Sequence, residues 1–257
     1  EIYNNTASQV QQNLETRMIS AYYDPNGVLW IGTNGGGVMC SDLRSQFYSR
    51  FYQDRHNEIC SITMDNDCFV WLATYHKGIM RSMEPYETGK RLQFSTVYSA
   101  AGDADETVLC SLKDAKGNLW FGNKNGELVA YDVKSRQFSV YTLIIDGNVS
   151  TSWVWALYMD AHGFLWIGTE QGLLLFEPKK GVCRRLPVEQ KLNSKEKLVV
   201  RAIVQAEDGA IWLGTSNKGV CKVTVSASGD ISAKIGYESK KNVESRSVRS
   251  LLVSSDG

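Results

Sequence analysis

The sequence predicts an all-β protein made of repeated four-stranded antiparallel sheets, and three observations support this prediction. A motif of the form Asp-x-x-Gly-x-x-Trp recurs along the chain, its tryptophans are spaced by 41, 49, 46 and 46 residues, and no segment has the periodicity of an amphipathic helix. A period in the forties with one tryptophan in each unit is typical of β-propellers, in which each four-stranded sheet is one blade.

The repeat motif is complete in five places and begins a sixth time at the end of the sequence. The copies are DPNGVLWIGTNGGGV (24–38), DNDCFVWLATYHKGI (65–79), DAKGNLWFGNKNGEL (114–128), DAHGFLWIGTEQGL (160–173), AEDGAIWLGTSNKGV (206–220) and the truncated SSDG (254–257). We therefore assign 17–257 to the propeller repeats and 1–16 to a partial outer strand or a linker of a preceding blade. Five complete repeats with partial ones predict a piece of a larger, seven-bladed propeller.

Each repeat is expected to form four strands in a fixed order. An apolar segment such as MISAYYD gives the first strand, and the Asp-x-x-Gly that follows forms a tight turn, because Asp accepts nearby backbone amides and Gly tolerates positive φ. The segment LWIGT gives the second strand, and a short loop ending in Gly leads to the third. A segment such as QFSVYT gives the fourth.

One position of the first strand holds a small residue in every repeat, four residues before the motif begins. These residues are Ser20, Ser61, Cys110, Ala156, Ala202 and Ser250. A position that stays small while its neighbours vary indicates crowding. We therefore predict that the first strand of each repeat is the innermost strand of its blade, where neighbouring blades converge.

The motif aspartates are interpreted as turn formers rather than metal ligands. They are Asp24, Asp65, Asp114 and Asp160. The equivalent residues in the last two copies are Ala206 and Ser254, a change that a turn tolerates and a metal site does not. The loop NGGG (34–37) lacks the Lys-Ser/Thr and the helix that a phosphate-binding loop requires. We expect no metal and no cofactor.

The five motif tryptophans are expected to be structural. They are Trp30, Trp71, Trp120, Trp166 and Trp212. A ligand-stacking role would select one or two of them, whereas their regular recurrence indicates that each packs between adjacent sheets. A buried tryptophan removes roughly 150–250 Å² from water.

The residues that break the repeat are the candidates for a ligand site. They are Trp153, Trp155, Arg201, Arg249, Tyr75 and His76. Both arginines occupy the repeat position of Trp155, at the start of a first strand. Aromatic rings and guanidinium groups near a channel mouth suit a polar, ring-shaped ligand such as a sugar. The alternative is that these residues fill an uneven channel or contact a neighbouring domain.

Composition excludes several classes of function. The chain has 28 basic and 28 acidic residues, which gives no electrostatic reason to expect nucleic acid or an anionic membrane as partner. No apolar run approaches the ~18–20 residues that cross a bilayer. The three histidines lie in different repeats and form no catalytic set with a nucleophile. The six cysteines lack metal-ligand spacing and are expected to be unpaired. The alternative, in an oxidising compartment, is that they form one or two disulfides.

The recurrent D-x-x-G-x-L-W-I-G-T-x-x-G-L, preceded by an apolar strand, resembles the two-component regulator propeller repeat. The resemblance extends from about residue 17 to 257. Three departures concern single turns and strands: Cys68 replaces the turn glycine, Ala73 replaces the glycine after the tryptophan, and Asn123 replaces the threonine. The repeat motif itself is scaffold and does not identify ligand residues.

The resemblance implies the periplasmic sensor region of an inner-membrane protein, such as a Bacteroidetes hybrid histidine kinase. It implies adjacent propeller and immunoglobulin-like domains in the same chain, a homodimer, and signal transduction by carbohydrate sensing, with an oligosaccharide released from a glycan as ligand. The segment itself would carry no enzymatic activity. Two rivals remain at this point: a protein-interaction or dimerisation propeller without a small ligand, and a propeller lyase, for which the chain has too few histidines.

Overall fold

The computed structural model describes residues 17–42, 47–52, 58–87, 90, 92–100, 106–186, 198–225, 231–237 and 247–253. These residues form strands, turns and loops, and none of them forms a helix. No described segment is therefore a helix of the length and apolarity that a membrane span requires. The predicted partial strand at 1–16 and the truncated repeat at 254–257 lie outside the described residues.

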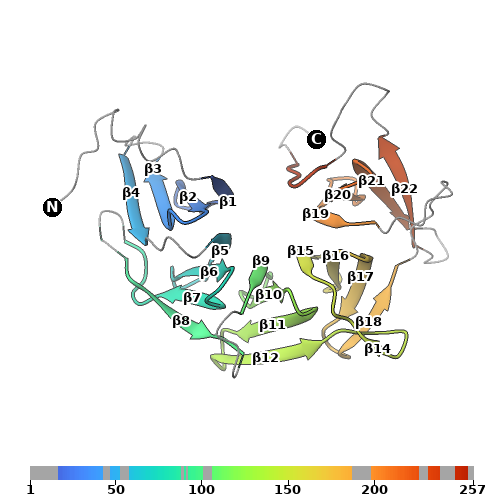
Figure 1. Cartoon of the computed structure of the whole chain (residues 1–257), viewed down its shortest axis with the longest axis horizontal. Helices are drawn as coiled ribbons and strands as arrows, with labels where there is room; N and C mark the ends of the chain where they lie inside the picture. Colours follow the sequence, from blue (N-terminus) through green and yellow to red (C-terminus); the bar gives the residue numbers. More distant parts are fainter. Residues whose placement is uncertain are drawn as a thin grey trace. The chain divides into compact units, whose positions relative to one another are not determined.

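Five four-stranded antiparallel sheets follow one another along the chain, and each sheet keeps its strands in sequence order (Figure 1). The first sheet contains β1 (Met18–Tyr23), β2 (Val28–Thr33), β3 (Val38–Asp42) and β4 (Phe47–Tyr52), and the second contains β5 (Ile59–Met64), β6 (Val70–Thr74), β7 (Ile79–Ser82) and β8 (Phe94–Tyr98). The third contains β9 (Val108–Lys113), β10 (Leu119–Asn123), β11 (Glu127–Asp132) and β12 (Gln137–Thr142). The fourth contains β15 (Val154–Met159), β16 (Leu165–Thr169), β17 (Gly172–Glu177) and β18 (Val182–Arg185), and the fifth contains β19 (Val200–Gln205), β20 (Ile211–Thr215), β21 (Val220–Val225) and β22 (Ile231–Tyr237).

These five sheets are the predicted blades, so the β-propeller fold class is confirmed. One element was not predicted: the linker before the fourth sheet folds into a two-stranded hairpin of β13 (Ile144–Ile145) and β14 (Asn148–Val149). The chain divides into two compact units. The first unit runs to Phe121 and includes Ala130–Phe138, and the second comprises Gly122–Val129 and the chain from Ser139 onward.

Each motif aspartate closes the turn between the first and second strands. Asp160 Oδ1 accepts the backbone N–H groups of His162 at 2.9 Å and Phe164 at 3.0 Å, and Asp160 Oδ2 accepts the indole N–H of Trp166 at 2.9 Å. The same arrangement recurs in the first three repeats, in which one carboxylate accepts two backbone N–H groups of the turn and the indole N–H of the tryptophan. The pairs are Asp24 with Trp30, Asp65 with Trp71, and Asp114 with Trp120. The same carboxylate thus fixes a turn and orients the tryptophan of the next strand.

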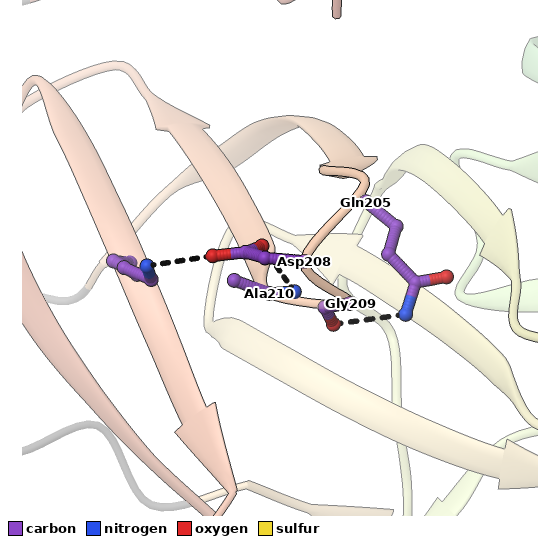
Figure 2. Close-up of polar contacts among 5 residues, drawn as sticks. Gln205, Asp208, Gly209 and Ala210 are labelled. Atoms are coloured by element: carbon purple, nitrogen blue, oxygen red, sulfur yellow. Dashed lines mark hydrogen bonds and ion pairs between the residues drawn. The ribbon is translucent and has the colours of Figure 1, made fainter. Parts of the chain in front are cut away.

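The fifth repeat lacks this aspartate and uses other groups. Asp208, two residues after Ala206, accepts the N–H of Ala210 at 2.9 Å, and Gln205 donates to the carbonyl of Gly209 at 2.9 Å (Figure 2). Asp208 also lies 3.3 Å from Lys222 Nζ. The turn therefore keeps its shape without the carboxylate at its first position.

The three departures from the repeat are accommodated locally. Cys68 takes the positive φ of the replaced glycine, 63°, and its N–H still donates to the Asp65 carbonyl at 3.3 Å. Ala73 is fully buried in β6. Asn123 accepts the N–H groups of Asn125 and Glu127 at 3.0 and 2.8 Å, whereas each threonine at this position donates its hydroxyl to a carbonyl in the following loop.

The core lies between neighbouring sheets. In the first unit, the Trp71 ring lies 4.7 Å from the Tyr131 ring, with Phe121 and Phe138 at 6.2 and 6.3 Å, so a tryptophan of the second sheet contacts three strands of the third. In the second unit, Trp166 belongs to a buried cluster that includes Val200 and Ile211 of the next sheet. None of the six cysteines, all of which lie among the described residues, forms a disulfide, and burial raises the pKa of Cys60 to about 12.

First strands of consecutive sheets contact one another in each unit: β1 meets β5 and β5 meets β9 in the first unit, and β15 meets β19 in the second. Ser20 and Ser61, two of the small residues, lie at these contacts. The Ser20 hydroxyl donates to the carbonyl of Ile59 at 3.0 Å, and the hydroxyls of Ser61 and Ser111 lie 2.8 Å apart. Ser20 and Ser61 thus each hydrogen-bond to the first strand of the next sheet.

Candidate functional site

A β-bulge interrupts the first strand of the first, second, fourth and fifth sheets at the same repeat position. In the fourth sheet Val154 pairs with Thr169 and Ala156 with Gly168, which leaves Trp155 as the extra residue. In the fifth sheet Val200 pairs with Thr215 and Ala202 with Gly214, which leaves Arg201 as the extra residue. Ile19 and Cys60 are the bulged residues of the first and second sheets. A bulge changes the direction of its side chain relative to the regular strand, so this position is structurally distinct.

The bulged residues of the fourth and fifth sheets stack on each other. The guanidinium carbon of Arg201 lies 3.5 Å from the centre of the Trp155 ring, and the Trp153 and Trp155 rings lie 5.2 Å apart at 42°. A guanidinium over an indole face at this distance is a cation–π contact worth roughly 0.5–2 kcal/mol. Trp153, Trp155 and Arg201 are all half-buried, so part of each side chain reaches the surface.

A hydrogen bond fixes the orientation of Arg201. Its Nε donates to the Ser216 hydroxyl at 2.9 Å, and Ser216 immediately follows the motif threonine of the fifth repeat. The Ser216 N–H donates to the carbonyl of Val199, which holds this loop against the start of β19. We call Trp153, Trp155, Arg201 and Ser216 the bulge cluster.

Burial and the nearby charge of Arg249 disfavour the protonated form of Arg201. Burial lowers its pKa from the ordinary value, and the positive charge of Arg249 lowers it further, whereas Glu170 has the smaller, opposite effect. Arg249 is exposed and follows Val248, whose N–H donates to the Thr215 carbonyl at 2.7 Å. The segment 247–253 is thereby attached to the end of β20, and a second guanidinium charge acts on the bulge cluster.

The indole nitrogen of Trp155 is buried and has no hydrogen-bond partner among the described residues. Most buried polar groups in proteins are paired, and the motif tryptophans on the first four repeats donate to an aspartate. Trp155 is therefore held by ring contacts and not by a hydrogen bond of its indole.

Tyr75 and His76 belong to the first unit and form a separate pair. Their rings lie 4.8 Å apart in an edge-to-face arrangement, in the loop after β6. The Tyr75 N–H donates to the Glu58 carbonyl at 3.0 Å, and its own carbonyl accepts the hydroxyl of Thr107. The structure brings Trp153, Trp155 and Arg201 of the second unit together, and the charge of Arg249 acts on Arg201, whereas Tyr75 and His76 pair with each other in the first unit.

Ser216 and Glu170 were missed by the sequence reasoning. Both follow the motif threonine, and Tyr75 occupies the same repeat position in the second repeat. The signal that could have identified them is this shared position beside the strand bulge. The described residues contain no group of three His, Cys, Asp or Glu side chains that could bind a metal ion.

Comparison with known families supports the resemblance seen in the sequence. Residues 14–35 and 148–171 match the model of the two component regulator propeller, so the chain carries repeats of this type. No curated protein matches the chain.

Solved structures show the same fold at low identity. The extracellular domain of BT4673 from B. thetaiotaomicron, a protein assigned as a hybrid two component or a one component system, is 17% identical with a TM-score of 0.70 over 92% of this chain and 30% of its own length. The extracellular domain of BT3049 from the same organism, assigned as a hybrid two component system, is 22% identical with a TM-score of 0.56 over 93% of this chain and 37% of its own. PorZ, a surface component of the type-IX secretion system of Porphyromonas gingivalis, is 14% identical with a TM-score of 0.66 over 91% and 36%.

Proposed function

We propose that this chain is part of the extracellular or periplasmic sensor of a two-component signalling protein, and that the bulge cluster binds an oligosaccharide derived from a glycan. The observation that carries the proposal is the stack of Trp153, Trp155 and Arg201 at two strand bulges. The repeat match and the extracellular domains that share the fold support the sensor assignment.

The chemistry of the cluster fits sugar binding. The apolar faces of a pyranose pack on indole rings, and the guanidinium donors bind sugar oxygens. The ligand would be bound and not transformed, because the one hydroxyl of the cluster, that of Ser216, accepts a hydrogen bond from Arg201 and donates to no base among the described residues. Adjacent propeller and immunoglobulin-like domains of the same polypeptide would transmit the signal, and the kinase or other output would lie outside this segment.

Sugar binding can be tested by isothermal titration calorimetry of the chain with a panel of plant, host and microbial oligosaccharides, both neutral and acidic. We expect at least one to bind, and Trp155→Ala to weaken that binding at least tenfold. The control is Trp212→Ala, because Trp212 is also a half-buried tryptophan, with Lys222 5.2 Å from its ring, but lies in the repeat motif. A bound sugar whose affinity is unchanged in Trp155→Ala would contradict the assignment of this site.

One observation favours the alternative of a protein-interaction or dimerisation surface. Ile144, Val149 and Val182 are 55%, 61% and 56% exposed, on the β13–β14 hairpin and on β18, which contacts β13. Binding of no sugar at millimolar concentration, together with a concentration-dependent dimer in light scattering, would replace the sugar-sensor proposal with this one.

A further inference from the structure

We infer that the ligand of the bulge cluster is an acidic oligosaccharide, whose carboxylate or sulfate group is bound by Arg201 and Arg249. This inference rests on the proposed function, and it specifies the chemical class of the sugar. It follows from the charges at the site, from the fixed orientation of Arg201 and from the position of the indole rings.

Among the described residues, little negative charge balances the two arginines. Neither makes an ion pair with a carboxylate of the described residues, and the charge of Arg249 acts unfavourably on Arg201. Arg201 is half-buried, so it has also lost part of its hydration. Among the described residues, Glu170 is the one carboxylate that raises the pKa of Arg201, and its effect is smaller than the lowering by burial and by Arg249. An anion bound between the guanidinium groups would relieve both the repulsion and the lost hydration.

The orientation of Arg201 is already fixed for such an anion. Its Nε is committed to Ser216, and one face of its guanidinium lies on Trp155. Its two terminal nitrogens make no hydrogen bond to any described residue, which leaves donors for a ligand. A planar guanidinium with free donors matches the paired oxygens of a carboxylate or sulfate, and the ordering of its side chain has been completed before binding.

The indole rings indicate that the anion is part of a sugar. Trp153 is half-buried and lies beside Trp155, so an indole surface remains accessible next to the cationic groups. An inorganic anion would use the arginines alone, whereas a uronic acid or a sulfated sugar would also cover the rings. Arginine binds the charge, and tryptophan binds the apolar face of the ring.

The test uses calorimetry on the whole chain with four kinds of probe: an oligogalacturonide, a sulfated chondroitin disaccharide, neutral oligosaccharides of matched length, and sodium sulfate alone. We expect one of the two acidic sugars to bind at least roughly tenfold more tightly than the neutral ones, as charge-assisted hydrogen bonds allow. Added salt should weaken this binding, because exposed charges are screened. The carboxylate and sulfate probes distinguish which anionic group is recognised.

Matched variants locate the binding to the arginines. Arg201→Gln and Arg249→Gln should each reduce the affinity for the acidic sugar by roughly ten- to a hundredfold, the range for a lost charged hydrogen bond. Arg201→Lys keeps the charge but loses the planar fork, and it should restore only part of the affinity. Arg184→Gln removes the same charge from the exposed face of β18 and should change nothing. Circular dichroism of each variant shows whether the fold is retained.

The outcomes separate this inference from the proposed function. A neutral sugar could bind tightly and lose its affinity in Trp155→Ala but not in Arg201→Gln. This result would overturn the inference of an acidic ligand and keep the proposal of a sugar sensor. Sodium sulfate that binds as tightly as the acidic sugars would overturn the role of the sugar ring. Binding of no sugar by a folded chain would overturn both proposals.

Discussion

At the scale of single residues, one carboxylate performs two structural tasks in each of the first four repeats. Its first oxygen accepts two backbone N–H groups of the turn, and its second accepts the indole N–H of the tryptophan six residues later. The turn could be predicted from Asp-x-x-Gly alone. The bond to the tryptophan could not, because it depends on the register that places Tyr158 opposite Trp166, just before the turn.

Asp160→Ala is expected to lower the free energy of unfolding by about 2–3 kcal/mol, because three donors lose their acceptor and the Trp166 residue is buried. Urea denaturation followed by tryptophan fluorescence measures this loss. Asp208→Ala is the control: Asp208 accepts one backbone N–H and forms an exposed ion pair, so its removal should cost much less. Equal losses for the two variants would show that the indole bond is unimportant.

At the scale of strands and turns, the bulges and glycines determine where each side chain points. The bulge in β15 and β19 gives Trp155 and Arg201 an orientation that a regular alternation would not. Glycines set the turns in two physically different ways. Gly163 has a φ of 82° with open space around it, whereas Gly126 has a φ of 79° and lies against the carbonyl oxygen of Ser150.

These two glycines allow backbone strain to be separated from crowding. Gly163→Ala should cost about 1–2 kcal/mol, the strain of a left-handed conformation alone. Gly126→Ala should cost about 3 kcal/mol or more, because its Cβ would also lie 2.4 Å from the Ser150 oxygen. Thermal and urea denaturation of both variants give the comparison. If Gly126→Ala were less destabilising than Gly163→Ala, the explanation by crowding against Ser150 would be wrong.

At the scale of the whole molecule, neighbouring sheets within each unit stabilise one another. The Trp71 ring bridges the second sheet to Tyr131 and Phe138 of the third, and Trp166 joins a buried cluster with residues of the fifth sheet. Stability in such arrays depends on each unit and on its interface with its neighbour. Loss of one interface should therefore loosen two sheets and not one.

Trp71→Ala is expected to cost about 4 kcal/mol, the range for removing a large buried aromatic ring. Hydrogen exchange should accelerate in β11 and β12 as well as in β6, because their side chains contact Trp71. Trp212→Ala should cost less, since Trp212 is only half-buried, and it should leave these strands unchanged, because Trp212 lies on β20 of the fifth sheet. Exchange confined to β6 in Trp71→Ala would argue against coupling between the sheets.

The sequence by itself determined the repeat, the order of the strands and the chemistry of the turns. These features depend on residues close together in the chain: alternating apolar residues form strands, and Asp-x-x-Gly and the loop glycines form turns. The sequence also identified Trp153, Trp155, Arg201 and Arg249 as residues that break the pattern, because their repeat equivalents are ordinary residues.

Only the tertiary structure decided which of these residues act together. Trp155 and Arg201 lie in different repeats, and their stack exists because β15 and β19 contact each other and carry a bulge at the same position. Tyr75 and His76 break the pattern equally, yet they form a separate pair in the first unit. Local patterns set each sheet, whereas ring stacking and charge repulsion depend on the packing of one sheet against the next, which no single repeat encodes.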